Sequence, residues 1–158
     1  ADGATTAGNA PGVNDGAAAL VLASEEWAAA QGHQPLARIL AEGHVADDYP
    51  YLVRTPAAAA RAALGRAGMS ISDVDLFEIN EAFCSVVLST IELLDADPEK
   101  FNVQGGAVAF GHPIGASGAR LITTLVYQLR RRGGGIGLAA ICSGAAQGDA
   151  ILIEVPAP

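Results

Sequence analysis

Residues 136–155 read IGLAAICSGAAQGDAILIEV, and this stretch decides the fold. Two apolar runs, at 136–142 and 149–155, have the length and composition of buried β-strands. Only the six residues SGAAQG separate them. A connection this short joins antiparallel neighbours, because a parallel pair needs a long crossover. We therefore predict two antiparallel strands side by side in one sheet.

Toward the N-terminus, segments with helical spacing alternate with further apolar runs. The predicted helices are 57–68 (AAAARAALGRAG, preceded by Pro56), 80–94 (NEAFCSVVLSTIELL) and 116–132 (ASGARLITTLVYQLRRR). The further predicted strands are 36–43 (LARILAEG), 75–79 (DLFEI) and a mixed strand or loop at 101–111 (FNVQGGAVAFG). Strands that alternate with helices indicate an α/β fold whose sheet is covered on both faces.

The first 32 residues form a part of their own. They contain a glycine-rich stretch at 8–16, an apolar run at 17–23 that predicts a strand, and a predicted helix that Ser24 can cap. The sequence GHQP at 32–35 then interrupts the pattern. We therefore predict a boundary here, between a segment at 1–32 and a domain at 33–158.

Composition argues against several classes of function. A net charge of −8 disfavours nucleic-acid binding, which needs clustered Lys and Arg. The arginines at 130–132 are explained as cations at the end of a helix. No apolar run approaches the ~20 residues that cross a bilayer, so we expect no membrane partner. Cys84 and Cys142 are too few for a disulfide framework, which predicts a reducing, cytoplasmic location.

Three polar residues lie where predicted strands end. Asn80 follows the run at 75–79, Cys142 closes the run at 136–142, and His112 follows the stretch at 101–111. Ligands of open α/β sheets bind at the carboxyl ends of strands, where free backbone N–H groups of helix N-termini also lie. The sequence therefore predicts that these residues share one pocket.

Each of these residues also has a structural explanation. His112 lies between Gly111 and Pro113 in a loop, which favours a functional imidazole over a core histidine. Cys142 fits either a buried structural cysteine or a thiol made reactive by nearby backbone N–H groups. Asn80 fits either a helix cap or a side chain that orients a water molecule.

Four motifs together resemble the thiolase family. NEAF (80–83), GGAVAFGHPIGASGAR (105–120) and CSG (142–144) resemble its C-terminal signatures. TAGNAPGVNDGAAALVL (6–22) resembles the segment that closes its N-terminal half. The resemblance covers nearly the whole chain in family order. It implies a thiolase-like C-terminal domain at 33–158 with a five-stranded mixed sheet, preceded at 1–32 by the end of the N-terminal half.

The resemblance also implies site residues. Thiolases join or cleave acyl-CoA units by a Claisen reaction, and a cysteine of their N-terminal half carries the acyl group. His112 matches the histidine that activates that cysteine and contributes to an oxyanion hole. Asn80 matches the asparagine that holds the water of this hole. Cys142 matches the cysteine that moves the α-proton, and the N–H of Gly144 matches a donor of a second oxyanion hole.

The resemblance further implies ligands and partners. Ala82 and Phe83 match residues that line the channel for pantetheine and acyl groups. The substrate is a coenzyme A thioester and no cofactor is implied. No residue of this chain matches the acylated cysteine, so we expect the chain alone to be inert and to need an N-terminal half or a companion subunit. Thiolases assemble as dimers or tetramers.

Two departures from the family pattern and three alternatives stay open. Pro11 stands where the family often has a serine that contacts pantetheine, and Ala145 and Ala146 interrupt a glycine-rich run. One alternative is a non-catalytic thiolase-fold subunit or a module that binds lipid or CoA. Another is a sterol-carrier-associated thiolase-like protein, although those carry a histidine motif at the position of NEAF. The third is a hydrolase with Cys142 as nucleophile and His112 as base.

Overall fold

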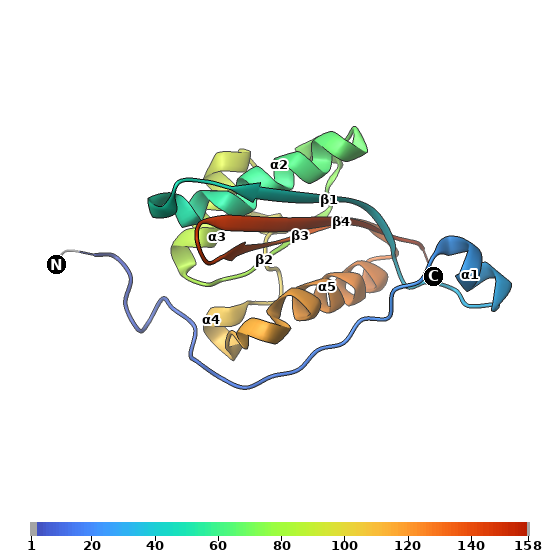
Figure 1. The fold of residues 1–158 in the computed structure, drawn as a ribbon, viewed down its shortest axis with the longest axis horizontal. Coiled ribbons are helices and arrows are strands. Elements are labelled where there is room, and N and C mark those ends of the chain that lie inside the picture. Colours follow the sequence, from blue (N-terminus) through green and yellow to red (C-terminus); the bar gives the residue numbers. More distant parts are fainter. Residues whose placement is uncertain (1–2, 158) are drawn as a thin grey trace.

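The computed structural model describes residues 3–157 and contains one mixed sheet of four strands. These are β1 (Arg38–Ala46), β2 (Leu76–Ile79), β3 (Gly135–Ser143) and β4 (Gln147–Val155). Their order across the sheet is β1-β4-β3-β2 (Figure 1). β3 and β4 pair antiparallel from Gly135↔Val155 to Ser143↔Gln147, which confirms the predicted antiparallel neighbours. β1 pairs antiparallel with β4, and β2 pairs parallel with β3.

The prediction of a fifth strand is wrong. The segment at 101–111 approaches β2 at only one isolated bridge, Phe77↔Phe101. The chain then turns, because Asn102 and Gly105 adopt positive φ angles of 44° and 83°. It continues into the short helix α4 (Ala107–Phe110).

Helices cover both faces of the sheet, as predicted. α2 (Thr55–Ala67) and α3 (Cys84–Leu94) lie on one face, and α5 (Ile114–Arg131) lies on the other (Figure 1). β2 is buried on both sides: Phe77 and Ile79 pack in the core under α2 and α3, and Leu76 packs in the core under α5. This double burial explains why LFEI reads as a continuous apolar run with one exception, Glu78.

The ends of the helices follow local chemistry, with one correction. Pro56 stands in the first turn of α2, and Gly68 ends it in the left-handed conformation. α3 begins at Cys84 and not near Asn80 as predicted. The residues ahead of it are engaged elsewhere: Asn80 N–H donates to the carbonyl of Ala140 at the edge of the sheet.

The N-terminal segment runs as an open trace along the α5 side (Figure 1). Its stretch at 17–23, predicted as a strand, pairs with no other strand among residues 3–157. α1 (Glu25–Ala30) follows, and the hydroxyl of Ser24 accepts from Trp27 N–H as predicted. The remaining elements are short 3₁₀ helices: η1 (Tyr49–Arg54), η2 (Ile71–Asp73) and η3 (Pro98–Lys100). Within the described part of the chain, no helix is long and apolar enough to cross a membrane.

Gly43 lets β1 and α2 pack backbone to backbone, and this contact makes a first prediction. A Cβ at this position would fall on the carbonyl oxygen of Ala59 and 2.7 Å from the nitrogen of Ala63. We expect Gly43→Ala to lower the free energy of unfolding by about 1–3 kcal/mol, because backbone cannot move aside as a flexible side chain can. Urea unfolding of the chain measures this loss.

Gly65→Ala is the matched control. A Cβ at Gly65, inside α2, would have no atom within 4 Å. This variant should be more stable than the parent by roughly 0.5–1 kcal/mol, because alanine loses less entropy in a helix. Equal stability of Gly43→Ala and the parent would contradict the close packing of β1 on α2.

Candidate active site

The site lies at the edge of the sheet where the parallel strands β2 and β3 end. Ile79 pairs with Ala140, so Asn80 and Cys142 each lie just beyond this last pair. Both side chains are buried, Asn80 completely. Carboxyl ends of parallel strands meet at one edge, and this brings together two residues that are 62 positions apart in the numbering.

His112 reaches the same edge from the loop between α4 and α5. Gly111, with φ of 100°, turns the chain immediately before it. The backbone N–H of His112 donates to the carbonyl of Gly12 at 3.4 Å. Nδ2 of Asn80 lies 3.3 Å from Nε2 of His112, within hydrogen-bond distance. The predicted imidazole and the predicted amide are thus direct neighbours.

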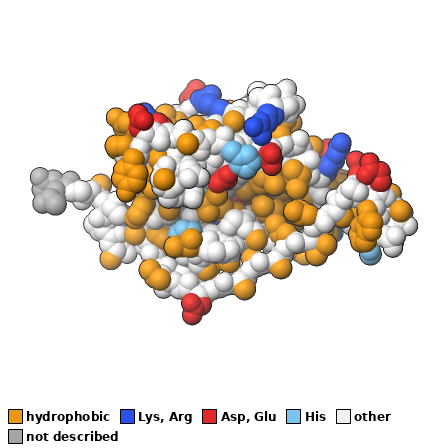
Figure 2. Space-filling view, in the orientation of Figure 1, with side chains coloured by type: hydrophobic (Ala, Val, Ile, Leu, Met, Phe, Trp, Pro, Cys, Tyr) orange, Lys and Arg blue, Asp and Glu red, His pale blue; other side chains and the backbone are white. Residues whose placement is uncertain are grey.

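A cavity of about 310 Å³ joins His112 and Cys142. Its walls combine apolar side chains with the polar end of the β3–β4 turn; the lining residues are Leu52, Ala82, His112, Ile114, Ile141, Cys142, Ser143, Gly144 and Asp149. Figure 2 shows hydrophobic side chains gathered in a hollow on one face of the molecule, above the N-terminal segment. An imidazole and a thiol on the wall of one largely apolar cavity are arranged to exchange protons with a bound molecule.

The surroundings of both groups favour their uncharged forms. Burial raises the pKa of the Cys142 thiol, so this residue carries its proton at neutral pH. Burial, and next the nearby Arg120 guanidinium, lower the pKa of His112 below its usual 6.5. A neutral imidazole has a free lone pair and can accept a proton, and a thiol can donate one.

The three other predicted site residues differ in their positions. Gly144 and Ala82 line the cavity. Phe83 is the N-cap residue of α3, about a third exposed, and lies outside the cavity wall. The departures from the family pattern, Ala145 and Ala146, adopt φ angles of 60° and 53° in the turn next to Gly144. Left-handed alanine costs roughly 1–2 kcal/mol per residue, so this turn holds strain beside the site.

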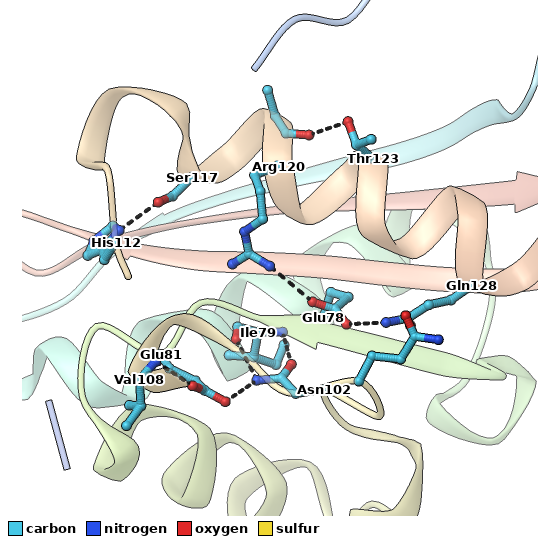
Figure 3. Close-up of polar contacts among 12 residues, drawn as sticks. Glu78, Ile79, Glu81, Asn102, Val108, His112, Ser117, Arg120, Thr123 and Gln128 are labelled. Carbon is cyan, nitrogen blue, oxygen red and sulfur yellow. Dashed lines mark hydrogen bonds and ion pairs between the residues drawn. The ribbon is translucent and has the colours of Figure 1, made fainter. Parts of the chain in front are cut away.

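The loops around the site are fixed by Glu81. Its carboxylate accepts from the backbone N–H of Val108 at 2.8 Å and from Nδ2 of Asn102 at 2.9 Å (Figure 3). Oδ1 of Asn102 in turn accepts from the N–H of Ile79 at 2.8 Å. Glu81 therefore ties the end of β2 to the loop that leads to His112.

A buried carboxylate lies behind the site, under α5. Oε1 of Glu78 accepts from Nε2 of Gln128 at 2.9 Å, and Oε2 lies 3.6 Å from Nη1 of Arg120 (Figure 3). Burial raises the pKa of Glu78 from 4.5 to about 7, because loss of water outweighs the Gln128 hydrogen bond and the Arg120 cation. This raised pKa makes the stability of the fold depend on pH.

The upward shift of the Glu78 pKa decides whether the fold gains or loses stability as the pH rises. A carboxyl whose pKa is raised on folding stabilises the fold below its unfolded pKa of 4.5, here by up to about 3 kcal/mol. The stabilisation is lost as the pH rises through about 7. Glu78→Gln cannot titrate, so its free energy of unfolding should not fall in this way. We therefore expect its stability relative to the parent to rise by up to about 3 kcal/mol between roughly pH 5 and pH 8.

Urea unfolding of Glu78→Gln and of the parent, at the lower and at the higher of these two pH values, measures the change in relative stability. Glu92→Gln is the control variant. Glu92 is exposed on α3, so its variant should follow the parent. If Glu78→Gln and the parent lost stability in parallel as the pH rises, Glu78 would not be the titrating group.

Reasoning from the sequence missed several residues of the site. Ser117 lies 2.6 Å from the His112 ring, and its only signal was its place five residues further on in the HPIGAS motif. Asp149 lines the cavity and contacts His44 across the β1–β4 pair at 2.5 Å. Only knowledge of the β1–β4 register could have placed Asp149 next to His44. No group of three or more His, Cys, Asp or Glu among residues 3–157 could hold a metal ion.

Fold and site together define an α/β protein with a cysteine, a histidine and an asparagine at the carboxyl edge of its sheet. The chain belongs to the thiolase family: residues 33–155 match the family model described as thiolase, C-terminal domain. An acetyl-CoA acetyltransferase of Shinella zoogloeoides is 49% identical over 153 residues, which are 97% of this chain and 39% of that protein. A mitochondrial 3-ketoacyl-CoA thiolase of Mus musculus is 45% identical, over 97% of this chain and 38% of that protein.

Solved structures show the same match. The crystal structure of the Bacillus anthracis acetyl-CoA acetyltransferase has a TM-score of 0.94 and 47% identity, and the match covers 98% of this chain and 39% of that one. Human mitochondrial 3-ketoacyl-CoA thiolase in complex with CoA has a TM-score of 0.90 and 40% identity, over 99% of this chain and 40% of that one. The chain thus spans about two fifths of the length of these relatives.

Proposed function

We propose that this chain is the C-terminal part of an acyl-CoA C-acyltransferase, a thiolase. It would carry out Claisen condensation, or the reverse thiolytic cleavage, of a 3-ketoacyl-CoA. The observation that carries the proposal is the placement of His112 and Cys142 on the wall of one cavity, with Asn80 in contact with His112, in a chain of this family. The acylated cysteine would come from the N-terminal part of the enzyme.

His112 is proposed as the base for that cysteine. Its Nε2 accepts the thiol proton, and the thiolate attacks the carbonyl carbon of the acyl-CoA. The imidazolium N–H that results then faces the oxygen of the thioester, where negative charge develops. The neutral state of His112, which burial and Arg120 favour, suits this first step.

Cys142 is proposed to move the α-proton. In condensation the CoA thiolate released by the acylation takes the proton of the Cys142 thiol, and the Cys142 thiolate that remains then removes a proton from the α-carbon of the second acyl-CoA. In cleavage the thiol returns a proton to that carbon. The backbone N–H of Gly144, on the cavity wall, is proposed to be a donor of a second oxyanion hole.

Asn80 is proposed to hold a water molecule that completes the oxyanion hole beside His112. Its Oδ1 is buried and accepts no hydrogen bond from any residue between 3 and 157. Buried amide oxygens are nearly always satisfied, by protein or by ordered water. A water that donates to Oδ1 would have its second proton free for a substrate oxygen.

The substrate is proposed to be a coenzyme A thioester, with no further cofactor. Ala82, on the cavity wall, and Phe83, beside it, are proposed to border the channel for pantetheine and acyl groups. The similar human mitochondrial thiolase was solved in complex with CoA, which supports this choice of ligand. Pro11, which departs from the family pattern, directly precedes Gly12 in the N-terminal segment. The carbonyl of Gly12 accepts from the backbone N–H of His112, so Pro11 lies near the proposed channel.

An N-terminal thiolase half, on the same chain or as a companion subunit, is the proposed partner. Three apolar side chains of the N-terminal segment are largely exposed, Val13, Val21 and Leu22, and Ile114 at the start of α5 is 82% exposed. Exposed apolar surface of this kind marks an interface. We propose that 1–32 completes the fold of that half, where 17–23 would find a partner strand. A dimeric or tetrameric assembly stays a prediction.

A cytoplasmic location is also proposed. Cys84 and Cys142 are free thiols, and Cys142 must stay reduced to move a proton. Reducing compartments keep such thiols in that state.

Activity of a completed enzyme tests the proposal. Residues 1–158 would replace the matching segment of the Shinella zoogloeoides acetyltransferase, which supplies the other three fifths or so of the length. We expect this chimera, called the complete enzyme below, to cleave acetoacetyl-CoA with CoA, and the 158-residue chain alone to be inert. A folded chimera without thiolysis would favour a non-catalytic thiolase-fold subunit, and turnover by the chain alone would contradict the need for a second half.

A further inference from the structure

Ser117 lies directly behind the His112 ring. It belongs to the first turns of α5 and is completely buried. Its Oγ lies 2.6 Å from Nδ1 of His112 and 3.0 Å from the carbonyl oxygen of Pro113 (Figure 3 shows the first contact). The proposed function uses only the opposite nitrogen, Nε2, so Ser117 has no role in it so far.

Counting protons assigns the direction of each hydrogen bond. A serine hydroxyl has one proton, and the Pro113 carbonyl can only accept. When the hydroxyl donates to Pro113, its oxygen must accept from Nδ1–H of His112. A neutral imidazole carries one proton, so Nε2 then holds a lone pair. Nδ2 of Asn80, an N–H donor, lies 3.3 Å from that lone pair and agrees with this arrangement.

We propose that Ser117 is a positioning residue that fixes the tautomer and the orientation of the His112 ring. It holds the proton on Nδ1 and thereby keeps Nε2 unprotonated, so that Nε2 can accept the proton of the acylated cysteine in place of the hydrogen bond from Asn80. When Nε2 takes that proton, Nδ1–H stays on Ser117, so the imidazolium forms without any movement of the ring. The proposal rests on the proposed function for its effect on rate, but the tautomer itself does not depend on it.

The other neutral tautomer of the ring is the alternative that Ser117 excludes. Without a partner at Nδ1, the ring could carry its proton on Nε2, facing the Asn80 amide, and could then not act as a base toward the cavity. The short hydrogen bond that Nδ1–H donates to the fully buried hydroxyl of Ser117 opposes this change. Thr123, two turns further along α5, provides a matched comparison: its hydroxyl donates to the Ala119 carbonyl at 2.8 Å and has no hydrogen bond to the His112 ring.

Nitrogen-15 NMR of the His112 ring in the 158-residue chain tests the tautomer without any turnover. We expect Nδ1 protonated and Nε2 unprotonated in the parent and in Ser117→Thr, which keeps a hydroxyl, and also in Thr123→Ala. Ser117→Ala should shift the population toward protonated Nε2. The proposal would be overturned by a parent ring protonated on Nε2, or by an unchanged tautomer in Ser117→Ala. The spectrum of the parent tests the tautomer even if a variant folds poorly.

Kinetics of the complete enzyme test the consequence. Ser117→Ala should lower kcat about tenfold, which is the worth of one hydrogen bond, with little change in KM. Ser117→Thr should recover most of this loss, and Thr123→Ala should lose little. If the NMR result is as expected but every complete enzyme is inactive, the proposed function is contradicted and the tautomer assignment stands. A normal kcat in Ser117→Ala would remove Ser117 from the mechanism.

Discussion

His112→Ala should lower kcat/KM for acetoacetyl-CoA cleavage by about 10²–10⁴ in the complete enzyme, the typical range for loss of a general base. Two functions disappear together in this variant. In the proposed mechanism the acylated cysteine loses the group that takes its proton, and the thioester oxygen loses a charged donor. Asn80 cannot compensate, because its amide does not act as a base and Nδ2 already faces the ring position.

The fold should tolerate this change. His112 is half-buried in a loop, and its contacts are polar ones, to Asn80 and Ser117. Urea unfolding of His112→Ala should therefore stay close to the parent, which separates a lost function from a lost fold. His33→Ala is the control, since His33 stacks on Trp27 at a ring distance of 5.6 Å, outside the cavity wall. Activity of His112→Ala within a few fold of the parent would remove the imidazole from the mechanism.

The pH profile provides a second readout for His112. Burial and Arg120 lower its pKa below 6.5, and only the neutral ring accepts a proton. Activity should therefore persist as the pH falls below 6.5 and decline only when the pH passes the lowered pKa. A decline centred above 6.5 would show that another group limits the rate.

Local chemistry was enough to predict most of the fold. The short connection at 143–148 predicted the β3–β4 pair, and alternating strands and helices predicted two covered faces. The fifth strand failed because the φ angles of Asn102 and Gly105 turn the chain after a single bridge to Phe77. Asparagine and glycine permit such turns without requiring them, so this outcome depends on tertiary contacts such as those of Asn102 with Ile79.

The site was predictable where strand ends decide it. Asn80 and Cys142 follow from the rule that carboxyl ends of parallel strands share an edge, and His112 from its Gly-His-Pro setting. Residues whose partners are side chains of distant elements or of the site itself were not predictable. Ser117 reads as an ordinary small residue at the start of a helix, and Glu78 reads as an odd polar residue in a strand, until α5 brings Gln128 to it.

Cys142→Ala should block the carbon–carbon bond step and spare the first acylation. We expect steady-state turnover of the complete enzyme to fall by about 10²–10⁴, because the two other titratable groups on the described cavity wall are engaged elsewhere, His112 with the acylated cysteine in the proposed mechanism and Asp149 with His44. The carboxylate of Asp149 lies 2.5 Å from Nδ1 of His44. The cysteine of the N-terminal part should still be acylated, since His112 is the proposed base for that step.

The covalent label separates this role from that of a nucleophile. Acetyl-CoA should acylate the parent and Cys142→Ala equally, on the cysteine of the N-terminal part, as mass spectrometry of digested protein would reveal. A hydrolase that used Cys142 as nucleophile would carry the label on Cys142 and lose it in the variant. The raised pKa of Cys142 argues against that role, because burial keeps it protonated and a thiol is a poor nucleophile. Cys84→Ala, which removes the other thiol at the start of α3, should change neither labelling nor turnover.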